Sequence, residues 1–357
     1  MTPNRLMRRI AALAAAVGLV VLVPATAQGA RTTTAQTAQT LQAAQTTQTT
    51  LNAQNAQAAR GAQSGPGAAG TAGERQGTAV ERTTTVRYGS YTIPASAGEE
   101  HGEISNRIAL NVEKPCTACF ITGIKPNLVY ADGSNANVNT GPMLHHMVLF
   151  KGSATDVTCS RPGQRIFASG NERVESVFPD GYGIKVDLGE RWTLLYDLMN
   201  HADTEKTVHI ELTFTHESAL LSGRKALTPL WMDVGGCLGS GYEAPEGISE
   251  KSWTWTSTVS GELIHMRGHL HHGGTAVWTE NLTTGRLLCE SVAEEGGTPE
   301  FIDLHGRTEI SDMSSCTGTP LGTISRGDEL RITSRYELTG HSHHGVMGIM
   351  VGWIARS

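Results

Sequence analysis

Histidines crowd one short stretch of this 357-residue sequence. The segment from His265 to Gly274 reads HMRGHLHHGG and holds four of the fourteen histidines. Side chains alternate between the faces of a strand, so His269 and His271 would project from one face, roughly 6.5 to 7 Å apart. Two imidazoles at that separation can share one metal ion. The same alternation turns His272 to the other face and leaves the cation of Arg267 beside the metal.

A methionine near the end of the chain offers a third donor of different character. Met347 follows a second histidine-rich segment, HSHHGV, at residues 341–346. A thioether sulfur is a soft, uncharged ligand that suits Cu(I) and contributes little to zinc or magnesium. His269, His271 and Met347 together therefore predict a copper site.

Two further histidines are adjacent in the segment MLHHMVLF, at residues 143–150. Neighbouring residues on a flat strand face opposite ways, so one metal can use both His145 and His146 only at a strand end or at a β-bulge. The alternative is one buried and one solvated histidine. Taken alone, the pair leaves both interpretations open.

The N-terminal region has the pattern of a secretory leader. Two arginines at residues 8–9 precede an apolar run at residues 10–23 and small residues at 25–27. The run is short for a membrane span, so we predict a signal peptide over residues 1–30 and a secreted, extracellular protein. An uncleaved anchor is the alternative. Residues 31–85 are dominated by Thr, Gln and Ala, and they predict a disordered low-complexity spacer.

The remaining sequence has the pattern of a β protein. Short runs rich in Val, Ile and Thr alternate with turn residues, and no stretch keeps a helical period. We predict an all-β fold of two antiparallel, jelly-roll-like β-sandwich domains in tandem, residues 86–225 and 226–357, joined within residues 217–247. The expected strands are 118–124, 147–150, 184–187, 193–199, 207–215, 262–266, 275–280, 286–290, 329–336 and 346–354.

Six cysteines in a secreted chain predict three disulfides, with Cys289 and Cys316 as the favoured pair. The spacing of Cys116 and Cys119 also occurs in redox and zinc motifs, but no second CxxC completes a zinc site. The chain has 28 basic and 34 acidic residues and no basic run after the leader, which argues against nucleic acid as a partner. No second apolar run is long enough for a membrane span after signal cleavage.

The two histidine groups and the methionine fit a known family. The sequence resembles the copper type II, ascorbate-dependent monooxygenases, the group of peptidylglycine alpha-hydroxylating monooxygenase and dopamine beta-monooxygenase. Four local matches occur in the family's order, and they are Cys119–Pro126, His145–Phe150, Arg267–His272, and Gly327–Leu330 with Tyr336 and Met347.

The resemblance implies two β-sandwich domains that each carry one copper and face each other across a solvent-filled cleft. His145 and His146 would hold an electron-storing copper. His269, His271 and Met347 would hold the copper that binds O2 and hydroxylates a C–H bond. Ascorbate, or another one-electron reductant, would supply electrons to up to two coppers per chain.

The third ligand of the first site is expected on a later strand. The segment LLYDLMNHA keeps the family's spacing from Leu198 to His201, although Ala202 replaces a tyrosine. A register shifted by three residues would instead place Leu198 at the ligand position. His201 is the predicted ligand, and His209 and His216 are less direct candidates.

Arg267 is the predicted substrate-binding residue, because guanidinium can pair with a carboxylate; a structural ion pair is the alternative. The peptide-anchoring positions of the family, near Met350 and Val351, do not match. We therefore predict a secreted copper- and O2-dependent monooxygenase that acts on a small molecule or peptide. The alternatives are a non-catalytic copper-binding protein that stores, scavenges or senses the metal, and an adhesin that binds zinc incidentally. The sequence does not set the oligomeric state.

Overall fold

The computed structural model describes residues 80–97 and 100–357. The predicted signal peptide, residues 1–30, lies outside the described residues, as does the predicted spacer up to residue 79. Strand β1 (Arg82–Ile93) begins before residue 85, where the spacer was expected to end. Its first residues include three threonines, and β-branched side chains favour a strand. Within the described residues, no helix is long and apolar enough to cross a bilayer.

The described chain is all β, as predicted. Its twenty strands are joined by turns and by the 3₁₀ helices η1 (Val138–Thr140) and η2 (Pro299–Phe301), and none of the described residues lies in an α-helix. After β1, the strands are β2 (Gly102–Val112), β3 (Cys119–Val129), β4 (Pro142–Thr155), β5 (Pro162–Ser169), β6 (Ser176–Val177), β7 (Tyr182–Val186), β8 (Trp192–Asn200), β9 (Lys206–Ser218), β10 (Lys225–Asp233), β11 (Tyr242–Ala244), β12 (Gly247–Thr256), β13 (Gly261–Leu270), β14 (Gly274–Asn281), β15 (Arg286–Glu295), β16 (Ile310–Met313), β17 (Ser315–Ile324), β18 (Glu329–Leu338), β19 (His343–Val346) and β20 (Gly348–Arg356).

These strands form four sheets. The largest has nine strands, in the order β1-β9-β3-β7-β10-β20-β13-β17, with β6 paired to β3. The others have the orders β2-β8-β4-β5, β12-β18-β14-β15-β16 and β11-β19. Neighbouring strands are antiparallel except for β7 and β10, which form a short parallel pair. Through that pair, the largest sheet continues from the first half of the described chain into the second.

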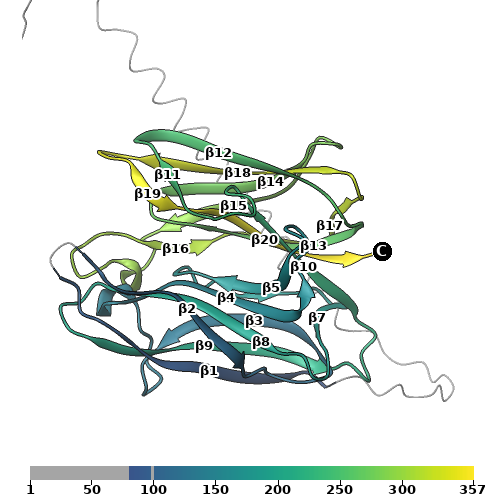
Figure 1. Ribbon diagram of the computed structural model, residues 1–357, viewed down its shortest axis with the longest axis horizontal. Helices are drawn as coiled ribbons and strands as arrows, with labels where there is room; N and C mark the ends of the chain where they lie inside the picture. Colours follow the sequence, from purple (N-terminus) through teal and green to yellow (C-terminus); the bar gives the residue numbers. More distant parts are fainter. Residues whose placement is uncertain (1–79, 98–99) are drawn as a thin grey trace, which may run out of the picture. The chain divides into compact units, whose positions relative to one another are not determined.

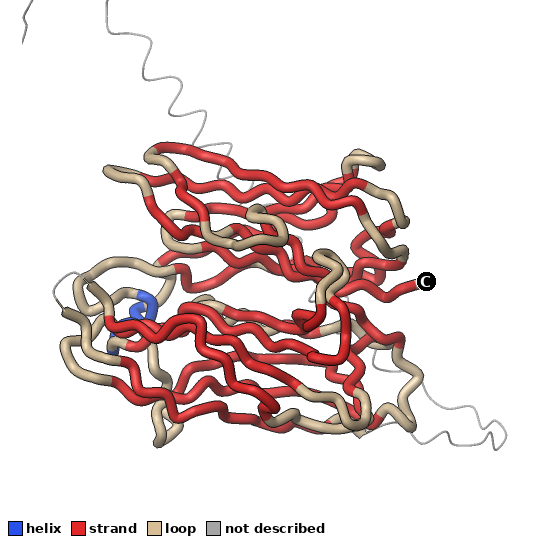
Figure 2. The backbone as a smooth tube through the Cα atoms, in the orientation of Figure 1, coloured by secondary structure: helices blue, strands red, loops and turns tan. Residues whose placement is uncertain are grey.

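The sheets lie in layers around two hydrophobic cores (Figure 1). The upper layer contains β12, β18 and β14, and it lies above β10, β13 and β20; β4 and β5 follow below, and β1 and β9 are lowest. Loops gather at the strand ends (Figure 2). The first core fills the space between the four-stranded sheet and β1, β3 and β9. The second core lies between the five-stranded sheet and β10, β13 and β20.

Strand β20 separates these two cores. Every residue from Gly348 to Ala355 is buried. The alternation of the strand places Ile349 and Val351 in the first core, and Met350 and Ile354 in the second. Because both faces are covered, the strand is a continuous apolar run rather than an alternating one.

The predicted join between domains, residues 217–247, contains a strand that the sequence analysis missed. β10 lies in the middle of the nine-stranded sheet, and Pro229 faces Trp353 of β20 within it. Proline cannot donate a hydrogen bond to its neighbour, which weakens a strand. Leu230 and Met232 are fully buried in the second core, however, and this burial stabilises β10. Residues 225–233 are therefore a strand and not part of a linker.

All six cysteines are paired, and the prediction of three disulfides is confirmed. Cys289 bonds to Cys316, the pair favoured by the sequence analysis. Cys116 and Cys119 are bonded to each other. Cys159, in the turn between β4 and β5, bonds to Cys237, which follows β10. This last bridge closes the longest loop, with a sequence separation of 78, and thus restricts the unfolded chain most.

One histidine, His265, is part of the packing between the cores. It is 2% exposed, its ring lies against Phe178 and Trp353, and its Nδ1 is 2.7 Å from Thr317 Oγ1. Burial, followed by the charge of Arg267, lowers the pKa of His265 from 6.5 to about 3. The unfolded chain would bind a proton at this residue below pH 6.5, whereas the folded chain would not until about pH 3. The contribution of His265 to stability is therefore complete above pH 6.5 and decreases as the pH falls toward 3.

The replacement His265→Gln should reduce the acid sensitivity of the fold. Between pH 6 and pH 4, the free energy of unfolding of the wild type should fall more steeply than that of the variant, by up to about 1.4 kcal/mol per pH unit. Urea unfolding of the metal-free protein at several pH values measures both slopes. Parallel slopes would contradict this role of His265.

Candidate metal centre

A β-bulge turns both histidines of β4 away from the first core. β4 pairs with β8, and its register shifts so that Leu144 faces Leu198 while His146 faces Asp197, which leaves His145 as the extra residue. In a regular strand with both histidines and no bulge, His146 would point into the core on the same side as Leu144. With the bulge, the two imidazoles lie on one side, with ring centroids 4.0 Å apart. The bulge is one of the two arrangements that the sequence analysis allowed.

The two histidines of the His-x-His motif meet this pair. His269 lies near the end of β13 and His271 just beyond it, with ring centroids 5.3 Å apart. His271 Nε2 is 2.8 Å from His146 Nε2, and the ring of His271 is 5.0 Å from that of His145. His145, His146 and His271 have ligand atoms within 4.8 Å of one another. We call His145, His146, His269 and His271 the histidine cluster.

This contact differs from the arrangement implied by the resemblance. That arrangement separates the two predicted sites by a solvent-filled cleft, whereas the rings of His146 and His271 touch. The cause is the packing of β13 and β20 against the four-stranded sheet. Arg267 of β13 donates a hydrogen bond to the carbonyl oxygen of Ala168 on β5, and this bond connects the two layers next to the cluster.

Three of the predicted ligands have carboxylate partners. In each case the Nδ1 atom lies 3.2 or 3.3 Å from an acidic oxygen, and the pairs are His146 with Asp197, His201 with Asp303, and His269 with Glu172. Such a partner fixes the tautomer that leaves the Nε2 lone pair free, as is common for metal-bound histidines. The Nε2 atoms of His201 and His269 are buried and have no hydrogen-bond partner among the described residues.

Burial favours the neutral form of His145 and His201. Burial, followed by the charge of His146, lowers the pKa of His145 well below its usual value. Burial also lowers the pKa of His201 to about 4. For Glu172, burial alone would raise the pKa, but the neighbouring His269 outweighs it and the pKa is about 2. Neutral imidazole is the form that binds a metal, so His145 and His201 need no proton release near neutral pH.

His201 lies beside the cluster in its own cavity. The His201 pocket, of about 170 Å³, is lined by residues that include His201, His145 and His271. His101, which the sequence analysis did not single out, also lines it. The rings of His101 and His201 have centroids 4.1 Å apart. The shifted register would have used Leu198, which is fully buried in the first core. His201, and not Leu198, therefore offers a side chain that can bind a metal.

The two less direct candidates lie elsewhere. His209 and His216 are both on β9. His216 Nε2 bonds to Thr84 Oγ1 at 2.9 Å, and neither histidine lines the cavities around the cluster.

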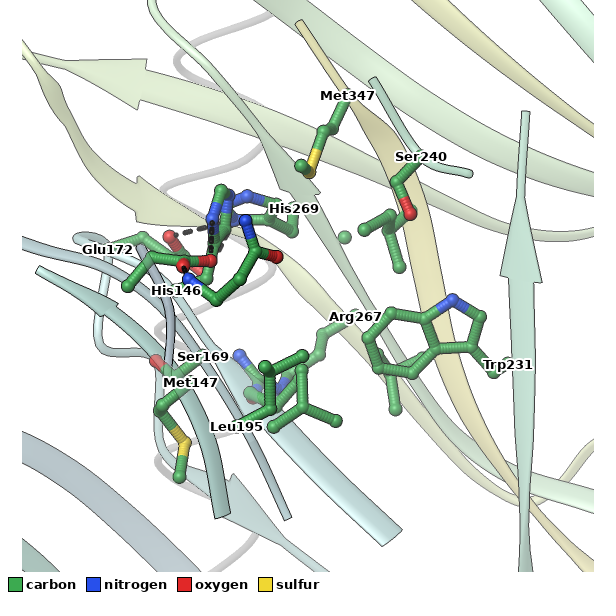
Figure 3. A pocket seen from close by; sticks show the side chains of 17 residues that line it. His146, Met147, Ser169, Glu172, Leu195, Trp231, Ser240, Arg267, His269 and Met347 are labelled. Carbon is green, nitrogen blue, oxygen red and sulfur yellow. Dashed lines mark hydrogen bonds and ion pairs between the residues drawn. The ribbon is translucent and has the colours of Figure 1, made fainter. Parts of the chain in front are cut away.

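Met347 lines a second cavity on the other side of the cluster (Figure 3). The Met347 pocket, of about 240 Å³, is also lined by His146 and His269 and by apolar side chains that include Leu195 and Trp231. In Figure 3 the sulfur of Met347 points toward the ring of His269, while Trp231 and Leu195 lie farther away. Met347 itself falls between β19 and β20, so the strand predicted over 346–354 is interrupted at this residue.

A buried tyrosine holds two predicted ligands at a fixed spacing. The Tyr336 hydroxyl accepts a hydrogen bond from the backbone N–H of His271 at 2.9 Å and donates one to the carbonyl oxygen of Met347 at 2.6 Å. Tyr336 is fully buried, so neither bond competes with water. The hydroxyl thus sets the distance between the backbones that carry these ligands.

These residues fit copper. The donor set consists of neutral imidazoles and a thioether, and buried Nε2 atoms without partners are the groups that a metal would satisfy. A hard cation such as magnesium would require oxygen ligands instead. The nearby carboxylates Glu172 and Asp197 are already engaged with imidazoles.

Arg267 is held more tightly than a free anchor would be. It is 2% exposed, and its guanidinium lies 4.9 Å from the ring centroid of Phe167. Burial lowers the pKa of Arg267 to about 10, with the charge of Glu172 acting in the opposite direction. It lines the Met347 pocket, but its hydrogen bond to Ala168 gives it a structural role in the packing of β13.

The carboxylates are the residues that sequence reasoning missed. Glu172, Asp197 and Asp303 lie 97, 51 and 102 positions from the histidines they bind. No local spacing connects such pairs, because they meet only when the sheets pack. Asp197 lies in the segment LLYDLMNHA, which drew attention because of His201, although its partner is His146. That position was the one sequence signal for any of the three carboxylates.

Several known proteins are similar to parts of this chain. Residues 215–357 match the family described as Stress up-regulated Nod 19. A protein of Phoma sp. named "Probable copper-dependent oxygenase M1" is 27% identical over 292 residues, which cover 77% of this chain and 73% of that protein. "Probable copper-dependent oxygenase clz3" of Cochliobolus lunatus is 25% identical over 246 residues, or 64% of this chain and 77% of that protein. Among solved structures, PNGF-II covers 76% of this chain and 66% of its own, with 10% identity and a TM-score of 0.35.

These sequence similarities support a copper oxygenase-like family. Both relatives carry the words copper-dependent oxygenase in their names. Neither name specifies a peptidylglycine or dopamine monooxygenase. The similarities therefore do not support the narrower group that the motifs resemble.

The carboxylate next to His269 provides a test of the centre. Glu172→Gln should weaken Cu(I) binding by about 10- to 100-fold, because the amide no longer fixes the His269 tautomer with a charged acceptor. Competition with a coloured Cu(I) chelator measures the affinity. Glu217→Gln is the matched control, since Glu217 pairs with Arg224 and lines neither cavity around the cluster, so this variant should keep the wild-type affinity. Equal affinity of Glu172→Gln and wild type would refute this role of the carboxylate.

Proposed function

We propose that this chain is a secreted copper- and O2-dependent monooxygenase that hydroxylates a C–H bond of a small molecule or peptide. The observation that carries the proposal is the buried Nε2 of His269, which has no hydrogen-bond partner in the described part of the chain and whose residue lines the same cavity as Met347. Imidazole and thioether side by side favour copper over other common metals. The names of the two relatives support the same chemistry.

In this proposal, His269, His271 and Met347 are the ligands of the catalytic site. His145, His146 and His201 are the ligands of a second, electron-storing site, which gives up to two coppers per chain. Copper in such sites supplies one-electron transfer and activation of dioxygen, with ascorbate or a similar reductant as the electron source.

The protein's own residues prepare both sites. Glu172 and Asp197 accept hydrogen bonds from Nδ1 of His269 and His146, so that both rings present Nε2 to the metal. Tyr336 keeps His271 and Met347 at a fixed spacing. The contact of 2.8 Å between His146 and His271 must open when a metal binds either nitrogen, so loading separates the two rings.

The Met347 pocket is the proposed substrate site. Its walls include Leu195, Trp231 and Val351, which would exclude water from the reacting C–H bond. Arg267 is the proposed polar contact, and its Nε has no partner among the described residues. A neutral acceptor on the substrate would satisfy this atom without the cost of burying a second carboxylate near Glu172.

Two further features complete the proposal. The three disulfides support an extracellular location, because such bonds persist in oxidising compartments. We assign residues 86–225 and 226–357 to two domains. Most of the first core falls in the first range and the second core falls in the second, while β20 contributes to both.

Copper content separates a two-site enzyme from a one-site binding protein. The wild-type chain, loaded with copper and dialysed, should retain two coppers, and Met347→Ala and His146→Ala should each lose one. His216→Ala should retain both, because this residue lies outside the cavities around the cluster. Atomic absorption gives the number per chain. A single copper that only Met347→Ala removes would contradict the second site.

Oxygen uptake separates catalysis from storage. The copper-loaded wild type should consume O2 when ascorbate is added with a fitting substrate, and His269→Ala should abolish this consumption because the proposed oxygen site loses a ligand. An oxygen electrode measures the rate, and His216→Ala again serves as the control. Copper binding without any ascorbate-dependent uptake would favour a non-catalytic copper-binding protein.

A further inference from the structure

Three histidines outside the cluster form a second group near the surface. His341 Nε2 and His343 Nε2 are 3.1 Å apart, and their ring centroids are separated by 4.8 Å. The ring of His272 lies 5.5 Å from that of His343. His272 and His341 are exposed, whereas the members of the histidine cluster are half-buried. None of these three residues has a role in the proposed catalytic or electron-storing site.

One member of the group, His272, has the same kind of carboxylate partner as the buried ligands. His272 Nδ1 lies 2.5 Å from a carboxylate oxygen of Glu295, so its Nε2 is free to bind a metal. Glu295 is itself fixed, because it accepts hydrogen bonds from Thr308 Oγ1 at 2.6 Å and from the backbone N–H of Gly273 at 3.1 Å. An exposed histidine on a flexible loop would not need this support.

The group is continuous with the histidine cluster. The His201 pocket is lined by His272 and His343 as well as by His271, His145 and His201. His271 and His272 are consecutive, and the chain turns after β13, where Gly274 N–H bonds to the carbonyl oxygen of His271. Thus one turn carries a half-buried imidazole of the cluster and an exposed imidazole of the surface group.

We propose that His272, His341 and His343 form an accessible copper-binding site that supplies copper to the buried cluster through the His201 pocket. The proposal rests on the proposed function, because it requires a buried copper centre to be filled. Imidazoles bind copper in both oxidation states, and exposed ones exchange it more readily than buried ones. Transfer is a ligand exchange: each step forms one copper–imidazole bond and breaks another, with no change in oxidation state.

The test follows the rate of copper uptake by the full chain. Cu(I) is presented as its coloured complex with bathocuproine disulfonate, and the loss of colour reports transfer to the protein. The double variant His341→Ala/His343→Ala should load several-fold more slowly than the wild type and reach the same number of tightly bound coppers. His305→Ala is the control: this exposed histidine lines neither cavity around the cluster, and its loss should leave the rate unchanged.

Two results would overturn the proposal. Equal rates for the double variant and the wild type would show that the surface group does not supply copper. Loss of a tightly bound copper from the double variant would make these residues ligands of the buried centre. Failure of the proposed function looks different, because Met347→Ala and His269→Ala would then keep the full copper content whatever the rate of loading.

Discussion

Strand β20 has no polar side, because each of its faces packs against a different hydrophobic core. β13 lies next to it and is almost as fully buried. Within β13, the buried polar side chains of His265 and Arg267 are held by Thr317 and by the carbonyl oxygen of Ala168. His269, His271 and Met347 lie where this pair of strands ends. The candidate metal centre thus lies at the edge of the two hydrophobic cores, where polar side chains can be accommodated.

Three histidines of the centre are held in the neutral form that a metal requires. Burial lowers the pKa of His145, His201 and His271, so a metal would face little competition from protonation at neutral pH. The carboxylates that orient the imidazoles remain charged, as the pKa of about 2 for Glu172 illustrates. A buried centre made of neutral donors and ionised supports would gain a large part of its stability only when a cation is present.

Sequence reasoning succeeded where the information was local. The spacing of His269 and His271 follows from the period of a strand, and the pairing of Cys289 with Cys316 follows from their positions along the chain. The bulge at His145 could be named as an option but not selected, because pairing with β8 decides it. Glu172 meets His269 across 97 positions, a distance over which no local pattern exists.

The same limit explains the strand that was missed. Pro229 and the glycines after β10 carry the local signals of a linker, and those signals were followed. Burial of Leu230 and Met232 between neighbouring strands is a property of the assembled sheet. Tertiary packing overrides local preference here, and it does so at the strand that joins the two halves of the largest sheet.

The bulge in β4 also bears on how such a centre can arise. On either side of His145 the strand keeps its regular pairing with β8: Leu144 and Met147 face the core, and His146 faces outward. A version of β4 without His145 would therefore be an ordinary strand with one outward imidazole and an unchanged core. A single inserted codon converts that strand into one with two adjacent imidazoles. The extra residue costs one local irregularity, and the hydrophobic packing on which the fold depends needs no compensating change.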